Sequence, residues 1–366
     1  MPVLSRRKAP APLLAALVVL ACTLRAAETP TFRLQDLTES SDVIAVVNIT
    51  VQSRLSSTTI AVGKTKYQAK QFTAEAIAEK WIKGQISPHI AIGYLVPDGF
   101  LGYAAVGFGR QLVFLRKVQD RKMWNLSSGY RADYEFTSPY YPSFPTVSQS
   151  ESQAVPESPD ADVNQKVMRE MGLVVASAHK SAIEKMHILE NADDLPADPA
   201  FDSLLRQGLD TAPDADIRLA IITILISRND VSVLPQAQAL LTGDSLLEKQ
   251  KRRLGYQLRS LRNPKAVPAL TVLLQSQDDT TRRGAAEALW HIADRSSVPA
   301  LVNALSDPNR DIRYFAVRAL ADITGDHEWG PEAAQFDDDQ SRIIQHWKNW
   351  AADQQAPPQT PSLPKQ

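Results

Sequence analysis

The feature that most constrains this chain is an internal repeat in its C-terminal half. The tetrapeptide Val-Pro-Ala-Leu at 267–270 recurs 31 residues later at 298–301, and with the same offset Arg282 maps to Arg313. A unit of this length holds two short helices and their turns, and it cannot bury its apolar face alone. The sequence therefore predicts helix pairs that stack to form a shared core.

Further matches extend the repeat toward the N-terminus. Lys251 and Arg218 hold the place of Arg282 in two earlier, less regular units. Proline is tolerated at the start of the first helix of a unit, and the turns at 277–279 and 307–309 contain residues that cap the second helix. Four units are predicted: 198–227, 229–261, 263–293 and 294–325.

These units resemble short HEAT repeats of the phycobilin-lyase type. The resemblance is carried by DPNRDIRYFAVRALADITG at 307–325 and SQDDTTRRGAAEALWHIA at 276–293. The Thr-Pro-Leu-His signature of ankyrin repeats and the tetratricopeptide pattern are absent from the sequence. The resemblance covers 198–325 and implies an α-solenoid.

The helical region is expected to extend beyond the four units. Asp160 or Asp162 can cap a helix that starts at 163. After Gly325 the repeat pattern stops, and Trp347 and Trp350 fall on one face of a terminal helix that would cover the open end of the stack. We predict an α-solenoid over 163–353 and a disordered Pro/Gln-rich tail over 354–366.

The N-terminal half has the alternation of short strands. Segments such as 43–51 (VIAVVNITV) and 112–115 (LVFL) are rich in β-branched and apolar residues, and turn signals separate them. The segment 71–82 is expected to be a strand, although its alanines and glutamates also suit a helix. Residues 32–136 therefore predict a small antiparallel β-barrel or sandwich.

This region is similar to a small β-barrel module of secreted bacterial proteins that is OB-like or netrin-like in outline. The similarity lies in LTESSDVIAVVNITV at 37–51, EKWIKG at 79–84 and GRQLVFL at 109–115. It implies no particular activity. The expected fold class is α+β multidomain, with an N-terminal small antiparallel β-barrel and a C-terminal α-solenoid of HEAT-like helix pairs.

A linker is expected between the two domains. Residues 137–162 contain five prolines and many serines, a composition that extends a chain without building a core.

The first 27 residues have the pattern of a signal peptide. Three bases at 6–8 precede the apolar run APLLAALVVLAC at 11–22, which is too short to span a bilayer. Cys22 ends the stretch Val-Leu-Ala-Cys, which resembles a bacterial lipobox and would place a lipid anchor on its thiol. Cys22 is alternatively a small apolar residue of an ordinary signal peptide, and Leu20 is not the preferred residue at its position.

Charge and cysteine usage exclude some functions. Without residues 1–27, the chain has 36 bases and 41 acids, so the mature form is mildly acidic and is not expected to bind nucleic acid. Cys22 is the only cysteine, which leaves the mature chain no disulfide and no thiolate metal site.

No catalytic, cofactor-binding or metal-binding residue is assigned. His327-Glu328 is a single pair of the kind found in deoxyhypusine hydroxylase, an iron-binding HEAT enzyme that needs several such pairs. Phycobilin lyases attach bilins in cyanobacterial cytoplasm, and an export signal contradicts that setting. No nucleophile elbow or P-loop is present in the sequence.

A basic residue repeats in register at Arg218, Lys251, Arg282 and Arg313. These residues form either a basic stripe for an acidic partner or a ladder between repeats, with Asp216 and Asp311 as carboxylate partners. We favour the ladder, because aligned charges in repeats usually connect neighbours. For Trp124 and Tyr140-Tyr141, exposed contacts and edge packing remain equally open.

The sequence thus predicts an exported protein of the periplasm or outer surface that binds unidentified envelope proteins through its repeat surface, without catalysis or cofactor. Two alternatives remain. One is an enzyme or enzyme accessory, lyase-like or with a small ligand in the barrel. The other is a structural envelope component with a lipid anchor to the membrane at Cys22.

Overall fold

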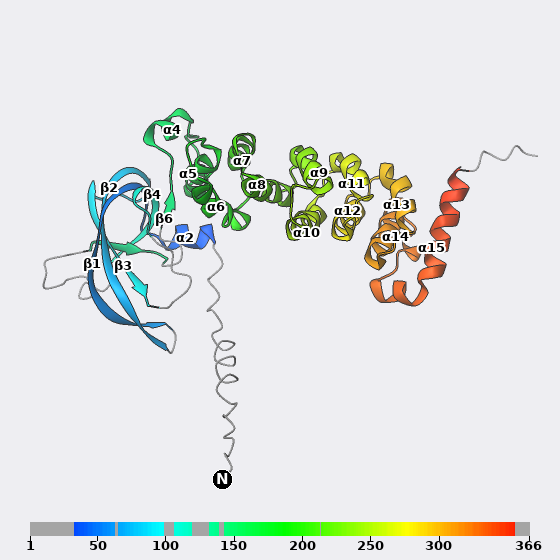
Figure 1. Ribbon diagram of the computed structural model, residues 1–366, viewed down its shortest axis with the longest axis horizontal. Helices are drawn as coiled ribbons and strands as arrows, with labels where there is room; N and C mark the ends of the chain where they lie inside the picture. Colours follow the sequence, from blue (N-terminus) through cyan, green and yellow to red (C-terminus); the bar gives the residue numbers. More distant parts are fainter. Residues whose placement is uncertain are drawn as a thin grey trace, which may run out of the picture. The chain divides into compact units, whose positions relative to one another are not determined.

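Figure 1 shows a computed structural model of the chain, which describes residues 33–62, 65–98, 106–118, 132–138, 143–212 and 214–355. The chain divides into two compact units, Met1–Val167 and Met168–Gln366. The predicted signal segment, Cys22, Trp124 and Tyr140-Tyr141 lie outside the described residues.

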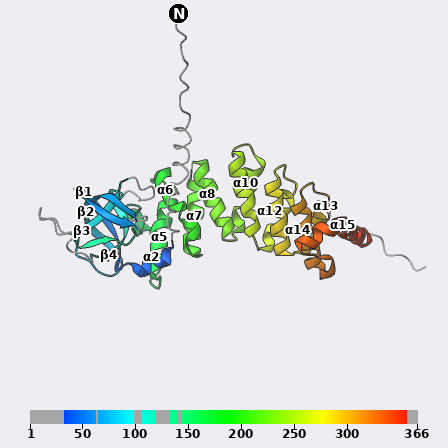
Figure 2. The ribbon, with the colours of Figure 1, turned by 90° about the horizontal axis from the view of Figure 1, so that it is seen from below.

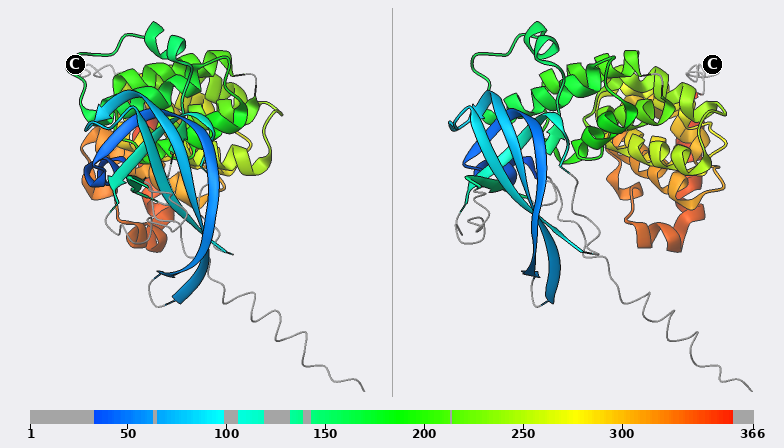
Figure 3. Two further views of the ribbon diagram at one scale, coloured as in Figure 1. Left: turned by 90° about the vertical axis from the view of Figure 1, so that its left-hand side faces the viewer. Right: turned by 60° about the vertical axis from the view of Figure 1, so that its left-hand side comes forward.

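The first unit contains a six-stranded sheet and short helices. Its two longest strands form a hairpin whose far end extends past the other strands (Figure 3). The elements are α2 Leu34–Ser40, β1 Val43–Val62, β2 Thr65–Lys83, β3 His89–Pro97, β4 Gly109–Lys117, β5 Tyr134–Phe136, β6 Ser143–Pro145 and α4 Gln149–Ala154.

The strands pair in an order that differs from their order along the chain. β1 lies between β2 and β4, so that Ala45 pairs with both Trp81 and Val113. β3 pairs with β2 and, in parallel, with β5, while β4 pairs with β5 and β6. The expectation of a strand at 71–82 is confirmed, because β2 runs through that segment in a ladder with β1.

Alternation along the strands produces two buried faces. One side chain set forms an apolar core that includes Val43, Val47, Ile92, Val113 and Phe136. At the edge of this core Tyr94 stacks on Phe72, with ring centroids 5.2 Å apart, and donates to Gln52 Oε1 at 2.8 Å. Burial raises the pKa of Tyr94 to about 12, so its phenol stays neutral at physiological pH.

The opposite face of β1 and β4 is covered by segments outside the main strands. Phe114 meets Phe144 edge to face, with centroids 6.1 Å apart, and both side chains are fully buried. Leu34 of α2 and Val147 are buried as well. Because both faces are covered, Ile44 and Val46 are as inaccessible as their inward neighbours, and β1 begins with a continuous apolar run from Val43 to Val47.

The prediction of a coreless linker over 137–162 is wrong for 143–154. Residues 143–145 form β6 on β4, and Ser148 caps α4 through a capping box with Glu151. Arg110 holds the turn between them by donating to the Val147 carbonyl at 2.6 Å and to Glu79 at 2.8 Å. The composition suggested a linker because prolines and serines are frequent, but the buried side chains of Phe144 and Val147 hold the segment against the sheet.

The second unit is helical. α5 begins at Val163, where Asp162 accepts from the Gln165 N–H at 2.9 Å as the predicted cap, and continues into this unit. The helices are α5 Val163–Ala176, α6 Ala182–Leu189, α7 Pro199–Thr211, α8 Ala215–Ser227, α9 Leu234–Thr242, α10 Glu248–Gln257, α11 Val267–Leu273, α12 Asp279–Ile292, α13 Val298–Ala304, α14 Arg310–Thr324 and α15 Ala333–Gln355. Short 3-10 turns join them, including η3 Leu258–Ser260 and η4 Pro264–Ala266.

The helices from α7 to α14 form pairs that follow the four predicted units. In Figure 1, α9, α11 and α13 form one row and α10, α12 and α14 form the other, and Figure 2 shows the second row from another side. Asp278 and Asn309 cap α12 and α14, as their turn positions predict. Second helices contact one another along the row, from α10 to α12 and from α12 to α14.

The last helix packs Trp347 fully into the unit. Its indole Nε1 donates to the Trp329 carbonyl at 3.0 Å, and its ring lies 5.7 Å from that of Trp350. α15 ends at Gln355, so the first two residues of the predicted tail are helical, and the remainder lies outside the described residues. Within the described part of the chain, no helix has the length and apolarity needed to span a membrane.

Candidate functional site

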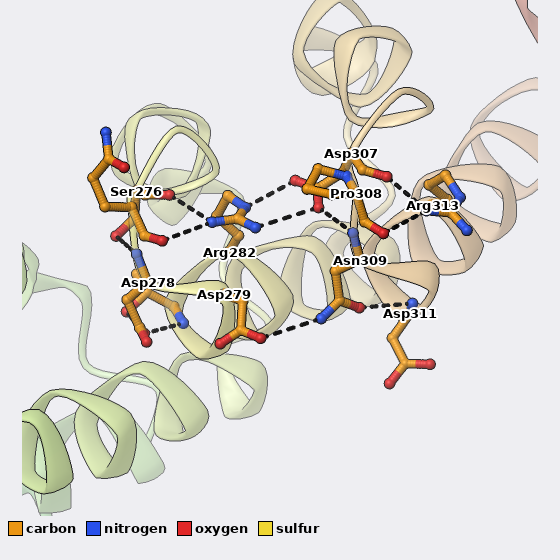
Figure 4. A network of polar contacts seen from close by, with 11 residues as sticks. Ser276, Asp278, Asp279, Arg282, Asp307, Pro308, Asn309, Asp311 and Arg313 are labelled. Carbon is orange, nitrogen blue, oxygen red and sulfur yellow. Dashed lines mark hydrogen bonds and ion pairs between the residues drawn. The ribbon is translucent and has the colours of Figure 1, made fainter.

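The repeated basic position holds a network at the start of α12 and α14 (Figure 4). Arg282 Nη1 donates to the carbonyls of Ser276 and Gln277 at 2.9 and 3.0 Å, at the end of the preceding turn. Its Nε donates to Asp307 Oδ2 of the next unit at 2.8 Å, and the two side chains are only 13% and 10% exposed. A planar guanidinium can make these bonds together because its donors diverge in one plane.

Arg313 repeats half of this arrangement. Its Nη1 donates to the carbonyls of Asp307 and Pro308 at 2.7 and 2.8 Å. With the Gln340 amide oxygen turned toward it, Nε and Nη2 of Arg313 donate to that oxygen at 2.7 and 2.8 Å. The position therefore satisfies turn carbonyls in its own unit and reaches one step further along the stack.

The other two members of the register behave differently. Arg218 is exposed and Lys251 is half-buried, and neither side chain makes a hydrogen bond or ion pair with any residue that the structure describes. Arg282 bonds the two carbonyls through Nη1 and the carboxylate through Nε, whereas a lysine has a single side-chain nitrogen and lacks this second, divergent donor. The four register residues are thus not one continuous ladder.

The predicted carboxylates also have other partners. Asp216 accepts from Gln250 Nε2 at 2.6 Å, and Asp311 lies 3.3 Å from Arg283 and 3.2 Å from Arg310. The carboxylate that meets Arg282 is Asp307. The sequence analysis assigns Asp307 only to a turn. Asp307 lies one repeat unit after Ser276, whose carbonyl Arg282 binds, and this position was the signal that could have identified it as the partner of Arg282.

A small hollow of about 90 Å³ opens on the surface of the second-helix row. We call the surface around it the Tyr256 surface. It is lined by residues of α10, α12 and the turns beside them: Tyr256, Arg259, Asp279, Thr280, Arg283, Gly284, Glu287 and Asn309.

Tyr256 is the exposed aromatic residue at this surface, with 48% of its area accessible. The Arg259 guanidinium lies 3.9 Å from the centroid of its ring, a cation–π contact that holds both side chains in place. Opposite, Arg283 pairs with Asp311 at 3.3 Å. Tyrosine and arginine in a preformed hollow are the residue types that contribute most to protein–protein binding.

A second aromatic group lies where α12 meets α14. Trp290 stacks on Phe315 at 5.7 Å, the Arg318 guanidinium lies 5.0 Å from a Trp290 ring centroid, and the indole donates to Asp322 at 2.8 Å. These contacts satisfy the indole within the unit. Trp290 therefore contributes to packing between α12 and α14. Tyr256 differs from it, because its ring is exposed and available for contact with a partner.

The histidines do not assemble a metal site. Among the described residues, no three His, Cys, Asp or Glu side chains lie close enough together to hold a metal ion. His327 has Asp322 at 3.5 Å as its neighbour. Burial, with the positive charge of Arg262 second, lowers the pKa of His291 below its ordinary value.

Comparison with known proteins identifies the repeat type. Residues 267–347 match the family of HEAT repeats. None of the curated proteins matches the chain. The matched range spans α11 to α14 and part of α15, which includes the Arg282 network and the two most regular units.

Solved structures give only distant likenesses. Human deoxyhypusine hydroxylase in complex with glycerol is 13% identical, covers 52% of this chain and 96% of its own, and has a TM-score of 0.23. An engineered protein is 18% identical over 56% of each chain, with a TM-score of 0.27. At such scores neither structure informs how this chain works.

Proposed function

We propose that this chain is an exported, non-catalytic scaffold that binds partner proteins on the second-helix row of its repeat region. The observation that carries the proposal is the Tyr256 surface, where an exposed tyrosine, a stacked arginine and a hollow occur together. The HEAT match over 267–347 supports it, because stacked helical repeats present extended binding surfaces.

The proposal includes the architecture on which that surface depends. We infer that the helix pairs over 198–325 continue as an α-solenoid and that α15, with buried Trp347, is its cap. In the first unit, each of β1 to β5 has at least two pairing partners, which supports closure of these strands into a small OB-like barrel. Export rests on the signal-peptide pattern of 1–27, and a lipid anchor rests on Cys22.

Site-specific photo-crosslinking in the native envelope tests the scaffold. A benzophenone amino acid is placed at Glu287, which lines the hollow, and as a matched control at Ile183 of α6, which is 83% exposed. We expect a discrete crosslinked protein from position 287 and none from position 183. Equal crosslinking at both positions, or none at 287, would contradict a binding role for this surface.

Export and anchoring are tested separately. Labelling with a fatty-acid analogue is compared between the natural chain and Cys22→Ser, followed by fractionation of the envelope. We expect label on the natural chain only. Label on neither protein, with the chain still released into the periplasm, would remove the anchor and leave the export proposal intact.

A further inference from the structure

One stretch of the repeat region carries bases without any acid. From 249 to 277 the chain contains seven lysines and arginines and no aspartate or glutamate. They lie on α10, η3 and the turns up to η4, and we call them the basic run: Lys249, Lys251, Arg252, Arg253, Arg259, Arg262 and Lys265. So many positive charges close together repel one another unless carboxylates or other anions lie nearby.

The described part of the chain does not supply them. None of the seven side chains forms an ion pair with a described carboxylate. Arginines elsewhere in the repeat region do: Arg228 meets Asp202 at 2.8 Å, Arg282 meets Asp307 at 2.8 Å, and Arg318 meets Glu332 at 3.0 Å. The positive field of the basic run is therefore left for solvent or for a partner.

The run reaches the hollow at the end of α10. Arg252 and Tyr256 are four residues apart on α10 and share one helical face, Arg252 is exposed, and Arg259 follows in η3. Arg259 stacks on Tyr256 and both line the hollow. A cavity of about 90 Å³ thus lies beside Tyr256, with Arg259 stacked on its ring and Arg252 exposed about one helical turn earlier.

We propose that this face binds an acidic segment of a partner protein, with carboxylates on Arg252 and Arg259 and an apolar side chain against Tyr256. The inference rests on the proposed scaffold function. A uniform polyanion such as nucleic acid fits less well, because Asp279 and Glu287 line the same hollow and repel phosphates. A peptide that mixes acidic and apolar residues can keep its charges on the basic run and avoid both carboxylates.

The test uses the full mature chain and a fluorescein-labelled dodecapeptide of Asp and Glu around one central Phe. Its counterpart of Asn and Gln around Phe is the uncharged control. The variant Arg252→Glu with Arg259→Glu is compared with Arg295→Glu and Lys348→Glu, two exposed bases outside the run, so that net charge changes equally. Melting temperatures verify folding, and Arg252→Gln with Arg259→Gln replaces the first variant if it unfolds.

We expect salt-sensitive binding of the acidic peptide that weakens about tenfold or more in the Arg252/Arg259 variant and less than threefold in the control pair. Tyr256→Ala should also weaken binding, while the salt dependence stays. Equal loss in both charge variants would overturn the assignment to this face, because net charge alone would then explain binding.

Other outcomes overturn the partner class. Tighter binding to a single-stranded oligodeoxynucleotide or to phosphatidylglycerol vesicles, lost in the same variant, would assign the face to those polyanions. Salt-sensitive self-association lost in that variant would assign it to a second copy. A crosslink from position 287 that persists in the Arg252/Arg259 variant would support the scaffold function and contradict binding of an acidic segment. If position 287 gives no crosslink in an otherwise natural chain, the scaffold function itself is contradicted.

Discussion

Two neighbouring helix contacts in the repeat region are built by different means. Where α10 meets α12, the two backbones touch: a Cβ on Gly284 would lie 2.1 Å from the Gly255 carbonyl oxygen, and one on Gly255 would lie 2.7 Å from Thr281 Oγ1. Where α12 meets α14, side chains hold the helices, through Arg282 with Asp307 and Trp290 with Phe315.

The difference explains where charge is free. In the second contact the cations hold the helices together, because Arg282 pairs with Asp307 and Arg318 lies over the Trp290 ring. In the first, glycines let the backbones approach, and packing requires no ion pair. The basic side chains of α10 can therefore remain without ion pairs while the helices stay packed. The same position in the repeat holds Arg282, which pairs with the next unit, and Lys251, whose side chain has no partner among the described residues.

The largest expected effect comes from Gly284→Ala. Alanine favours a helix interior by about 1 kcal/mol over glycine, yet its Cβ would collide with the Gly255 carbonyl and push α10 from α12. We expect a net loss of about 2–3 kcal/mol in the free energy of unfolding, measured by urea titration. Thr280→Ala on the same helix should change it by less than about 0.5 kcal/mol; an equal change in both would refute backbone contact as the cause.

Arg282→Ala should have the next largest effect. It leaves Asp307 and two turn carbonyls without their donor, and we expect a loss of about 2 kcal/mol in the free energy of unfolding. Its neighbour Arg283, 46% exposed and paired with 34% exposed Asp311, is the matched control, and Arg283→Ala should cost less than about 1 kcal/mol. A double-mutant cycle with Asp307→Ala that shows no coupling would contradict the ion pair.

The smallest effect concerns the field of the basic run. Burial and then Arg262 lower the pKa of His291, so Arg262→Gln should raise that pKa toward its ordinary value, as followed by NMR titration. The neutral form is favoured in the folded state. Its contribution to stability is therefore complete above about pH 6.5 and is lost as pH falls below that value. Arg206→Gln, on α7, should leave the titration of His291 unchanged.

An unchanged pKa of His291 in Arg262→Gln would mean that solvent already screens the basic run. The contrast between the two helix contacts would then remain one of packing alone. A shift in the expected direction would show that the unpaired charge acts on its surroundings.

Periodicity predicted the helix pairs because it records which residues must be buried together. The units at 263–293 and 294–325 coincide with α11–α12 and α13–α14, and the capping residues Asp278 and Asn309 were identifiable from their turns. The carboxylate partner of Arg282 was not identifiable, because the choice between Asp311 and Asp307 depends on how far one helix pair is displaced relative to the next. Spacing along a chain does not encode that offset.

The first unit shows a second limit. The strands β1 and β2 are longer than the apolar runs that predicted them, because past Val51 the hairpin continues as a backbone ladder in which polar side chains such as Gln71 and Thr73 are buried. The contribution of 143–154 was missed, since proline and serine dominate its composition while Phe144 decides its placement. The Tyr256 surface could have been predicted, because Tyr256 lies between Arg253 and Arg259 in the sequence. The sequence analysis considered only the bases that repeat at regular spacing.

The pairing of β6 with β4 has a practical consequence for any fragment of this protein. A fragment ending at residue 136, the end suggested by composition, would strip Ser143–Pro145 from β4 and expose Phe114 to water. The freed strand edge and apolar side chain would invite association with other chains, and insolubility would then be a result of the chosen end point. A fragment continued to Val167 keeps that edge protected and is the sounder unit for ligand screening of the sheet domain.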